Sequence, residues 1–428
     1  MNLTIEKVIY GGNGLARLND QAVFVPFTLP GEVVEATDAG VKDGVATAQL
    51  EAVLQPSDDR VAAACDHFTA CGGCHLQQAS YKAQLTIKRG ILRETLERAG
   101  VSDLPAIATL SAEPWGYRNR IRLRIAKHDG ALRVGYLRRG TLEFLPVHMC
   151  PIAAPLLWRA AESLLTLNEN PWIQDAEEVE LFANDDLTKL QLMLFLSRQP
   201  KGSFNSFCES LQQQLPELIG AGVSIMEGAS RGRKTQRFRP GPSWGATGMN
   251  YHVANESYWV SRGGFFQVNR SLLSDLVHLV THSRSGSLAW DLYAGVGLFS
   301  RVLAKNFSAV VAVEAAAEDL QRSFRGNGRR AIEATTVEFL RRAVLERDRP
   351  DLIVLDPPRA GAGAEVCSLL ARMRTPEIVY VSCDPITLGR DLKLMVDSGY
   401  RLCALHLVDM FPQTYHQETV AVLRYTAT

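Results

Sequence analysis

The pattern of apolar and polar positions changes several times along the 428-residue chain. Up to about residue 57, short apolar runs are broken by proline and glycine at the spacing typical of a small β-barrel. Residues 79–100 carry a helical pattern, and Gly100 suits its C-terminal end. Strand-rich sequence follows from about residue 112 to 261. From about residue 272, strands and helices alternate, which predicts a mostly parallel, doubly wound sheet.

These changes predict a multidomain α/β protein with three parts. We expect a small OB-like β-barrel over residues 1–57, an α+β central domain over 58–262 and a Rossmann-like domain over 263–428. The helical stretch 79–110 could pack on the C-terminal domain. No apolar run approaches the roughly 20 residues that span a bilayer, and the N-terminus lacks the features of a signal peptide. We therefore expect a cytoplasmic monomer that does not enter a membrane.

Composition narrows the chemistry only in part. The formal net charge is zero, so an argument for a nucleic-acid partner has to be local. Eight cysteines in a long chain without an export signal argue against a disulfide framework. They are expected to be free thiols, metal ligands or catalytic groups.

A glycine turn between a strand and a helix marks a candidate cofactor pocket. In "DLYAGVG", Gly295 and Gly297 would let a ligand approach the backbone at a helix N-terminus. Glu314 ends the next strand, where an acid binds ribose hydroxyls and repels a 2′-phosphate. This arrangement resembles the class I S-adenosylmethionine (SAM) methyltransferases. A nicotinamide enzyme that uses NAD is the alternative.

Two further strand ends carry candidate reactive groups. Asp356-Pro357-Pro358 ends one strand, and in nucleic-acid amino-methyltransferases a similar motif with an aromatic residue holds the amine; here Arg359 takes the aromatic position. The next strand ends at Cys383. A thiolate could add to C6 of a pyrimidine and make C5 nucleophilic. That route needs a base to remove the C5 proton, and Glu418, which opens a hydrophobic strand, is the candidate.

Five ordered motifs together resemble the RNA 5-methyluridine methyltransferases. They are "GGFFQVN", "DLYAGVG", "LDPPRAG", "VSCDPITLGRDL" and "HQETV". The resemblance implies that Cys383 is the nucleophile and Glu418 the proton acceptor. It assigns SAM contacts to Gln267, Tyr293, Glu314 and Asp356, and Gly295 lies in the same turn. The Gly-Asp pair that often contacts adenine is absent, and Thr335 and Thr336 stand near its place.

A cysteine cluster precedes the predicted helix. The spacing Cys65-x5-Cys71-x2-Cys74 indicates a metal site, with Cys150 as a plausible fourth ligand. Four thiolates suit zinc and iron–sulfur clusters equally, and His67 and His75 keep a mixed zinc site open. The ribosomal-RNA branch of the family carries a [4Fe–4S] cluster on cysteines at this spacing, so the resemblance favours that group.

Two basic segments are candidate RNA contacts. Alternation places the side chains of Arg118, Arg120, Arg122 and Arg124 on one face of a strand. Four arginines on one face repel each other unless anions lie there, which favours phosphate binding over a merely solvated strand. Residues 231–239 form a second basic run. The N-terminal barrel resembles a TRAM domain, although it holds seven acidic and only three basic residues up to Ser57.

The resemblance therefore predicts methyl transfer from SAM to C5 of a uridine in structured RNA. Large-subunit (23S) ribosomal RNA is favoured because the barrel and the cysteine cluster occur together in that branch, and tRNA is the second choice. Two alternatives remain open. One is an amino-methyltransferase that uses Asp356-Pro357-Pro358, and the other is a non-catalytic RNA-binding or iron–sulfur sensor protein with a relict fold.

Overall fold

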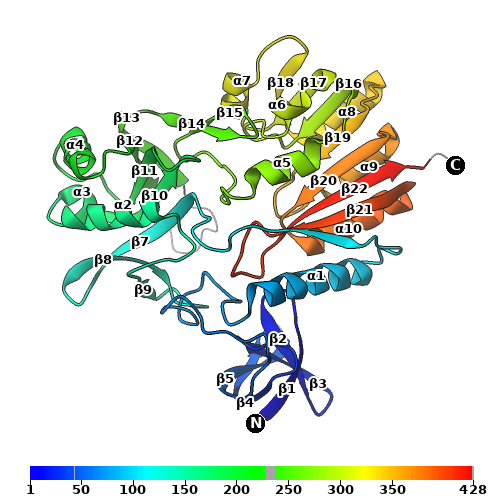
Figure 1. Ribbon diagram of the computed structural model, residues 1–428. Coiled ribbons are helices and arrows are strands. Elements are labelled where there is room, and N and C mark those ends of the chain that lie inside the picture. The colour runs from blue at the N-terminus through cyan, green and yellow to red at the C-terminus, as the bar shows by residue number, and fades with distance from the viewer. Residues whose placement is uncertain (43, 228–236, 427–428) are drawn as a thin grey trace. The chain divides into compact units, whose positions relative to one another are not determined.

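A computed structural model describes residues 1–42, 44–227 and 237–426 (Figure 1). The chain divides into two compact units. The first contains residues 1–69, 73–114 and 275–428, and the second contains residues 70–72 and 115–274. The first unit is therefore built from both ends of the chain.

The N-terminal strands of the first unit form a closed barrel, drawn in blue in Figure 1. Its strands follow the order β1-β2-β3-β5-β4. The elements are β1 Asn2–Val8, β2 Asn13–Leu18, β3 Gln21–Pro26, β4 Val33–Lys42 and β5 Val45–Gln55. Alternate residues of β1 are buried, because Leu3 and Ile5 point into the barrel core. The predicted small β-barrel is confirmed.

The helix α1, Tyr81–Arg98, follows the barrel in the same unit. The Ser80 side chain caps its N-terminus by accepting from the amide of Ala83. Gly100 stands just beyond its end with a φ of +81°, a conformation that glycine adopts without strain. The helix therefore begins and ends as its sequence predicts. It packs against α10, Pro385–Asp397, of the C-terminal sheet domain.

The C-terminal part of the first unit is a mostly parallel sheet with the strand order β18-β17-β16-β19-β20-β22-β21-β6. Counted from β16 onward in the chain, this is the order 3-2-1-4-5-7-6, with β6 added at the edge. β22 runs antiparallel to both of its neighbours. The strands are β6 Ile107–Leu110, β16 Gly286–Leu292, β17 Phe307–Glu314, β18 Arg329–Glu333, β19 Leu352–Leu355, β20 Glu377–Ser382, β21 Tyr400–Val408 and β22 Glu418–Tyr425.

Helices connect these strands, as expected for a doubly wound sheet. They are α5 Leu273–Thr281, α6 Ser300–Leu303, α7 Glu318–Ser323, α8 Thr336–Glu346, α9 Gly363–Met373 and α10 Pro385–Asp397. The strand β19 is buried along its whole length, because helices cover both faces of the sheet. The predicted Rossmann-like fold is confirmed.

The second unit is an α+β domain around one sheet of order β13-β12-β11-β10-β7-β8-β9, with a separate β14-β15 hairpin. Its strands are β7 Arg120–His128, β8 Ala131–Leu137, β9 Phe144–Pro146, β10 Ala176–Ala183, β11 Leu190–Leu196, β12 Leu218–Glu227, β13 Arg237–Gly245, β14 Gly248–Val253 and β15 Glu256–Ser261. Its helices include α2 Pro155–Thr166, α3 Pro171–Gln174 and α4 Phe204–Gln214. Reading this region as strand-rich missed these helices, although Pro155 and Pro171 are typical of a first helical turn.

Candidate active site

Parallel strands bring the sequence-predicted residues of the C-terminal domain to one edge of the sheet. β16 pairs with β17 and β19, and β19 pairs with β20, all in parallel. Glu314 closes β17, whereas Asp356 and Cys383 directly follow β19 and β20. Because the carboxyl ends of parallel strands share one edge, these three side chains lie at that edge.

The antiparallel strand β22 adds the predicted base to this edge. Ser382 at the end of β20 pairs with Thr419 near the start of β22. Glu418 precedes Thr419, so its register position lies opposite Cys383. The charge of Glu418 contributes to the raised pKa of Cys383, as expected for side chains at facing positions. The structure thus brings together the predicted nucleophile and the predicted proton acceptor.

The glycine turn forms the cofactor end of the site. Gly295 has a φ of +55°, and a Cβ built on it meets nothing within 4 Å, so its outer face is open. The amide of Gly295 donates to Oε2 of Glu314 at 2.9 Å. This bond ties the turn after β16 to the carboxylate that ends β17. A ligand at this turn can therefore contact the backbone and that carboxylate together.

Asp291 lies on β16 just before the turn and is fully buried. Its Oδ2 accepts hydrogen bonds from the Ser300 amide, at 2.9 Å, and from the Ser300 hydroxyl. Burial raises the pKa of Asp291 to about 7, and the neighbouring charge of Glu314 acts in the same direction. The residue therefore holds the turn to the start of α6.

Tyr293 occupies the left-handed region, with a φ of +62°. Its phenol is hydrogen-bonded to Thr336, at the start of α8. Thr335 caps that helix in a capping box with Glu338. The two threonines that stand in place of the usual Gly-Asp pair thus anchor a helix and the Tyr293 side chain. Their contact with adenine stays a prediction.

The Cys383 thiol is half-buried, and its pKa is raised to about 12. Burial is the largest cause, and the carboxylates of Glu418, Asp356 and Asp384 add to it. Arg359 lowers the pKa but does not compensate for the carboxylates. The free site therefore holds a protonated thiol, although the chemistry proposed from the sequence requires a thiolate.

The residues after Cys383 begin a helix. Oδ1 of Asp384 accepts from the amides of Ile386, at 2.9 Å, and Thr387, at 3.1 Å. Pro385 occupies the first helical position, where its missing N–H costs nothing. The Asp-Pro pair is therefore the N-cap of α10 as well as the end of β20, and it fixes the backbone that carries the thiol.

Glu418 is buried, with 2% of its surface exposed. Burial and the charge of Asp356 raise its pKa well above the usual range, and Arg359 opposes them. Among the described residues, Oε1 of Glu418, both amide atoms of Gln417 and the Thr419 hydroxyl lack hydrogen-bond partners. Buried polar groups without partners are costly, so this cluster suits a site that a polar substrate completes.

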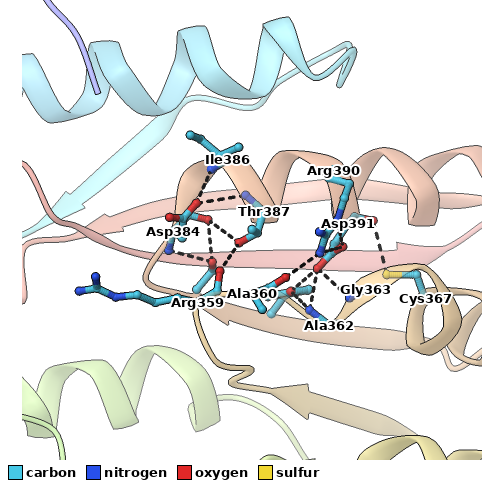
Figure 2. Close-up of polar contacts among 12 residues, drawn as sticks. Arg359, Ala360, Ala362, Gly363, Cys367, Asp384, Ile386, Thr387, Arg390 and Asp391 are labelled. Carbon is cyan, nitrogen blue, oxygen red and sulfur yellow. Dashed lines mark hydrogen bonds and ion pairs between the residues drawn. The ribbon is translucent and has the colours of Figure 1, made fainter. Parts of the chain in front are cut away.

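A buried carboxylate that sequence reasoning missed organises the loop after Asp356. Oδ2 of Asp391 accepts from the Tyr380 hydroxyl at 2.7 Å and from the Ala362 amide at 2.7 Å. Figure 2 shows the contact between Asp391 and Ala362 and also the Thr387 hydroxyl, which donates to the Arg359 carbonyl at 3.1 Å. The backbone of Arg359 is thus fixed, while its side chain extends away from the bonded cluster (Figure 2).

A second missed network holds the segment that leads to Glu418. Nζ of Lys88 on α1 donates to Oδ1 of Asp409 at 2.5 Å, and neither side chain is exposed. The Tyr81 hydroxyl donates to Oδ2 of Asp409 at 2.9 Å. Gln84 exchanges two hydrogen bonds with Gln413 farther along the same segment. The helix α1 therefore fixes both the end of β21 and the approach to β22.

The four cysteines of the predicted cluster are half-buried, and none of them forms a disulfide bond. Cys65 and Cys74 belong to the first unit and Cys71 and Cys150 to the second. Tyr136, in the second unit, has a strongly raised pKa because it is buried and is hydrogen-bonded to Cys150, and the Cys71 thiol acts in the same direction. Within residues 1–42, 44–227 and 237–426, no group of three or more His, Cys, Asp or Glu side chains is assembled to hold a metal ion.

The predicted arginine row has partners that its sequence did not reveal. The neighbouring strand β10 supplies Glu178, which pairs with Arg122 and Arg124, and Glu180, which pairs with Arg120. These carboxylates relieve the repulsion from which phosphate binding was inferred, so that reason was wrong. RNA binding by the row stays a prediction.

The remaining candidates lie elsewhere in the second unit. Arg118 precedes β7, and its guanidinium is close to Tyr136 and Cys150. Gln267 is buried, and its backbone carbonyl accepts from the Asn119 amide group at 3.0 Å. Its role as a SAM contact stays a prediction. Residues 231–236, which make up most of the second basic run, lie outside the described residues.

The sheet order, the glycine turn and the acid that closes β17 define a class I SAM-dependent methyltransferase. Residues 331–426 match the family model described as tRNA (Uracil-5-)-methyltransferase, and residues 1–50 match the TRAM domain. The chain is 34% identical to an uncharacterized RNA methyltransferase of Aquifex aeolicus, across 99% of this chain and 98% of that protein. It belongs to the family of RNA uracil-C5 methyltransferases.

Two further comparisons agree with this assignment. The chain is 32% identical to the 23S rRNA (uracil(1939)-C(5))-methyltransferase RlmD of Pseudomonas entomophila, across 98% of this chain and 92% of that protein. A crystal structure of Pyrococcus abyssi tRNA (uracil-54, C5)-methyltransferase with S-adenosyl-L-homocysteine has a TM-score of 0.76 and 23% identity, and it covers 99% of this chain and 100% of that one. The likeness to the Pyrococcus abyssi structure supports the assignment of the fold.

Within the described residues, none of the helices has the length and apolar character needed to cross a membrane. The predicted monomeric state and cytoplasmic location stay predictions.

Proposed function

We propose that this protein transfers a methyl group from SAM to C5 of a uridine in 23S ribosomal RNA, with Cys383 as the nucleophile and Glu418 as the base. The observation that carries the proposal is the opposition of these two side chains across β20 and β22, in register with the Ser382–Thr419 pair. The relative from Pseudomonas entomophila, which is named for 23S rRNA, supports this choice of RNA.

The first step is the addition of the Cys383 sulfur to C6 of the uracil ring. The S–C6 bond forms as the C5–C6 double bond opens, and the electron pair moves onto C5 and the neighbouring carbonyl. The thiol proton must leave first, and the surrounding carboxylates of Glu418, Asp356 and Asp384 are the nearby acceptors. Because a uridine in folded RNA is stacked, its base has to swing out before the thiol reaches C6.

Bound SAM supplies an electrophilic methyl group and leaves as S-adenosylhomocysteine. The methylated C5 still carries its original proton. Glu418 removes this proton, the C5–C6 double bond forms again and the C6–S bond breaks, which regenerates the thiolate. A buried carboxylate with a raised pKa is a stronger base than an exposed one, so the burial of Glu418 serves this step.

Trapping on RNA that contains 5-fluorouridine tests the mechanism. Fluorine at C5 cannot leave as a cation, so a covalent protein–RNA adduct should accumulate when SAM is present. Cys383→Ala should abolish both the adduct and methylation, and Cys403→Ala, which changes a half-buried thiol on β21, should change neither. Methylation by the Cys383→Ala variant would refute the proposal.

The choice of RNA needs a separate test. We expect 5-methyluridine to disappear from 23S rRNA in a strain that lacks this gene and to return with the parent gene but not with Cys383→Ala. Mass spectrometry of digested rRNA and tRNA measures both substrates together. Loss of 5-methyluridine from tRNA alone would assign the enzyme to tRNA.

We further propose that Cys65, Cys71, Cys74 and Cys150 hold a [4Fe–4S] cluster with a structural role. Four cysteines outside any disulfide are a donor set that such a cluster accepts, and Cys71 and Cys150 both influence Tyr136. The cluster supplies no step of methyl transfer. Anaerobically purified protein should contain iron and sulfide and absorb visible light. Cys150→Ser should lose these signals and Cys208→Ser should keep them, whereas bound zinc in their place would refute the cluster.

A further inference from the structure

The turn between β1 and β2 of the barrel approaches the active-site segments of the same unit. Its glycines Gly11 and Gly12 have φ values of +101° and +82°. A Cβ on Gly12 would lie 3.0 Å from Cβ of His75 and 3.5 Å from Cβ of Tyr415. A larger residue at Gly12 would therefore be strained and crowded. The turn is built to lie close to the segment that leads to Glu418.

Tyr10, on this turn, contacts the segments of both proposed catalytic residues. Its hydroxyl donates to Oδ2 of Asp384 at 2.7 Å. Asp384 follows Cys383 directly, and its other oxygen caps α10. The ring of Tyr10 also meets the ring of Tyr415 edge-on, with centroids 5.3 Å apart. One barrel side chain thus touches the residue after the nucleophile and the segment before the base.

We propose that Tyr10 is a positioning residue for methyl transfer, through which the N-terminal barrel fixes Asp384 and, with it, the Cys383 thiol. This inference rests on the proposed function. It gives the barrel a role in catalysis that does not depend on contact with RNA. Such a role suits the barrel, whose seven acidic and three basic residues up to Ser57 are poorly matched to a phosphate backbone.

The hydrogen bond from Tyr10 to Asp384 also changes the electrostatic environment of the Cys383 thiol. Asp384 is one of the carboxylates that raise the pKa of Cys383. The Tyr10 hydroxyl donates to Asp384 and so stabilises the negative charge of that carboxylate locally. The hydrogen bond therefore weakens the repulsion between the Asp384 carboxylate and a Cys383 thiolate. Burial and the nearby Asp384 raise the pKa of Tyr10 well above its usual value, so the phenol remains a neutral donor at working pH.

Tyr10→Phe removes this donor and keeps the ring. We expect adduct formation with 5-fluorouridine RNA to slow by about tenfold or more, as is typical for loss of a hydrogen bond to a charged group. The pH dependence of that rate should shift to higher pH, because the thiolate then faces a less compensated carboxylate. SAM affinity, measured by calorimetry, should stay within about twofold and would show that the domain is folded.

Two matched variants separate positioning from simple docking of the barrel. Lys7→Gln breaks another contact of the barrel, the ion pair between Lys7 Nζ and Glu94 Oε1 at 2.6 Å, and should leave the rate and its pH profile unchanged. Asp384→Asn keeps an oxygen that can cap α10 and removes the charge, so it should shift the profile to lower pH.

The outcomes are distinguishable. The inference is overturned if Tyr10→Phe matches the parent in rate and pH profile, or if Lys7→Gln slows the reaction as much as Tyr10→Phe does. Neither result would affect the proposed function as long as Cys383→Ala is inactive. Conversely, methylation by Cys383→Ala would refute the proposed mechanism whatever Tyr10→Phe does.

Discussion

The Cys383 thiol should react slowly with alkylating agents in the free enzyme. Its pKa of about 12, compared with 9.0 for an unperturbed thiol, lowers the thiolate fraction at pH 8 by roughly a thousandfold. A more basic thiolate is also more nucleophilic, and over three pKa units this recovers a factor of about 15 to 30. The net expectation is alkylation about 30- to 60-fold slower than that of an unperturbed thiol.

The assay is timed reaction with iodoacetamide across a pH series, followed by mass spectrometry of the peptide that contains Cys383. The rate should rise about tenfold per pH unit and show no plateau up to pH 10. Glu418→Gln removes the carboxylate with the largest charge effect on this thiol, so it should lower the pKa and speed alkylation at pH 8. If the thiol were only shielded sterically, alkylation would be slower by the same factor at every pH, and the midpoint of its pH dependence would be unchanged. A plateau below about pH 9 would refute this account of the site.

Three further variants test the framework around the site. Lys88→Met should lower the free energy of unfolding by about 3–5 kcal/mol in urea denaturation because it leaves Asp409 charged and buried, and adding Asp409→Leu should restore part of the loss. Asp291 stabilises the fold below its unfolded pKa of 3.8, and this contribution is lost as the pH rises to about 7. Between pH 5 and 8, the free energy of unfolding of Asp291→Asn should therefore fall by about 3 kcal/mol less than that of the parent. Equal pH dependence of the free energy of unfolding in the two proteins would contradict this. Gly295→Ala should weaken SAM binding more than tenfold in calorimetry, while its free energy of unfolding should fall by only about 1–2 kcal/mol. Gly297→Ala should lower the free energy of unfolding more, because its Cβ would meet Leu320.

Features that depend on local sequence were predictable. The glycine turn, the strand-ending acids and the thiol after β20 each show a short pattern with its own physical reason. Their meeting at one edge follows from the parallel sheet alone. The N-cap role of Asp384 was equally local, because an aspartate before a proline is a frequent helix start.

Features that depend on distant partners were not predictable from short patterns. Glu178 and Glu180 meet the arginine row only because β10 pairs with β7, and nothing near Arg122 indicates that pairing. The sequence did contain weaker indications that some charged side chains have distant partners. Lys88 and Asp391 each occupy the apolar face of a helix, between buried neighbours. A charged residue at such a position requires a partner, but periodicity does not name it.

The split first unit has a consequence for synthesis on the ribosome. Lys88 finds its partner 321 residues later in the chain, and β6 pairs with β21, near the C-terminus. At about 5–20 residues per second, the nascent α1 waits roughly 15–60 s for these contacts. Meanwhile residues 115–274 can already fold, since their unit is almost continuous. The emerging segment that carries α1 and β6, residues 73–114, is therefore the part of this enzyme most exposed to chaperones and proteases, and a ribosome that stalls before the last strands leaves it unprotected.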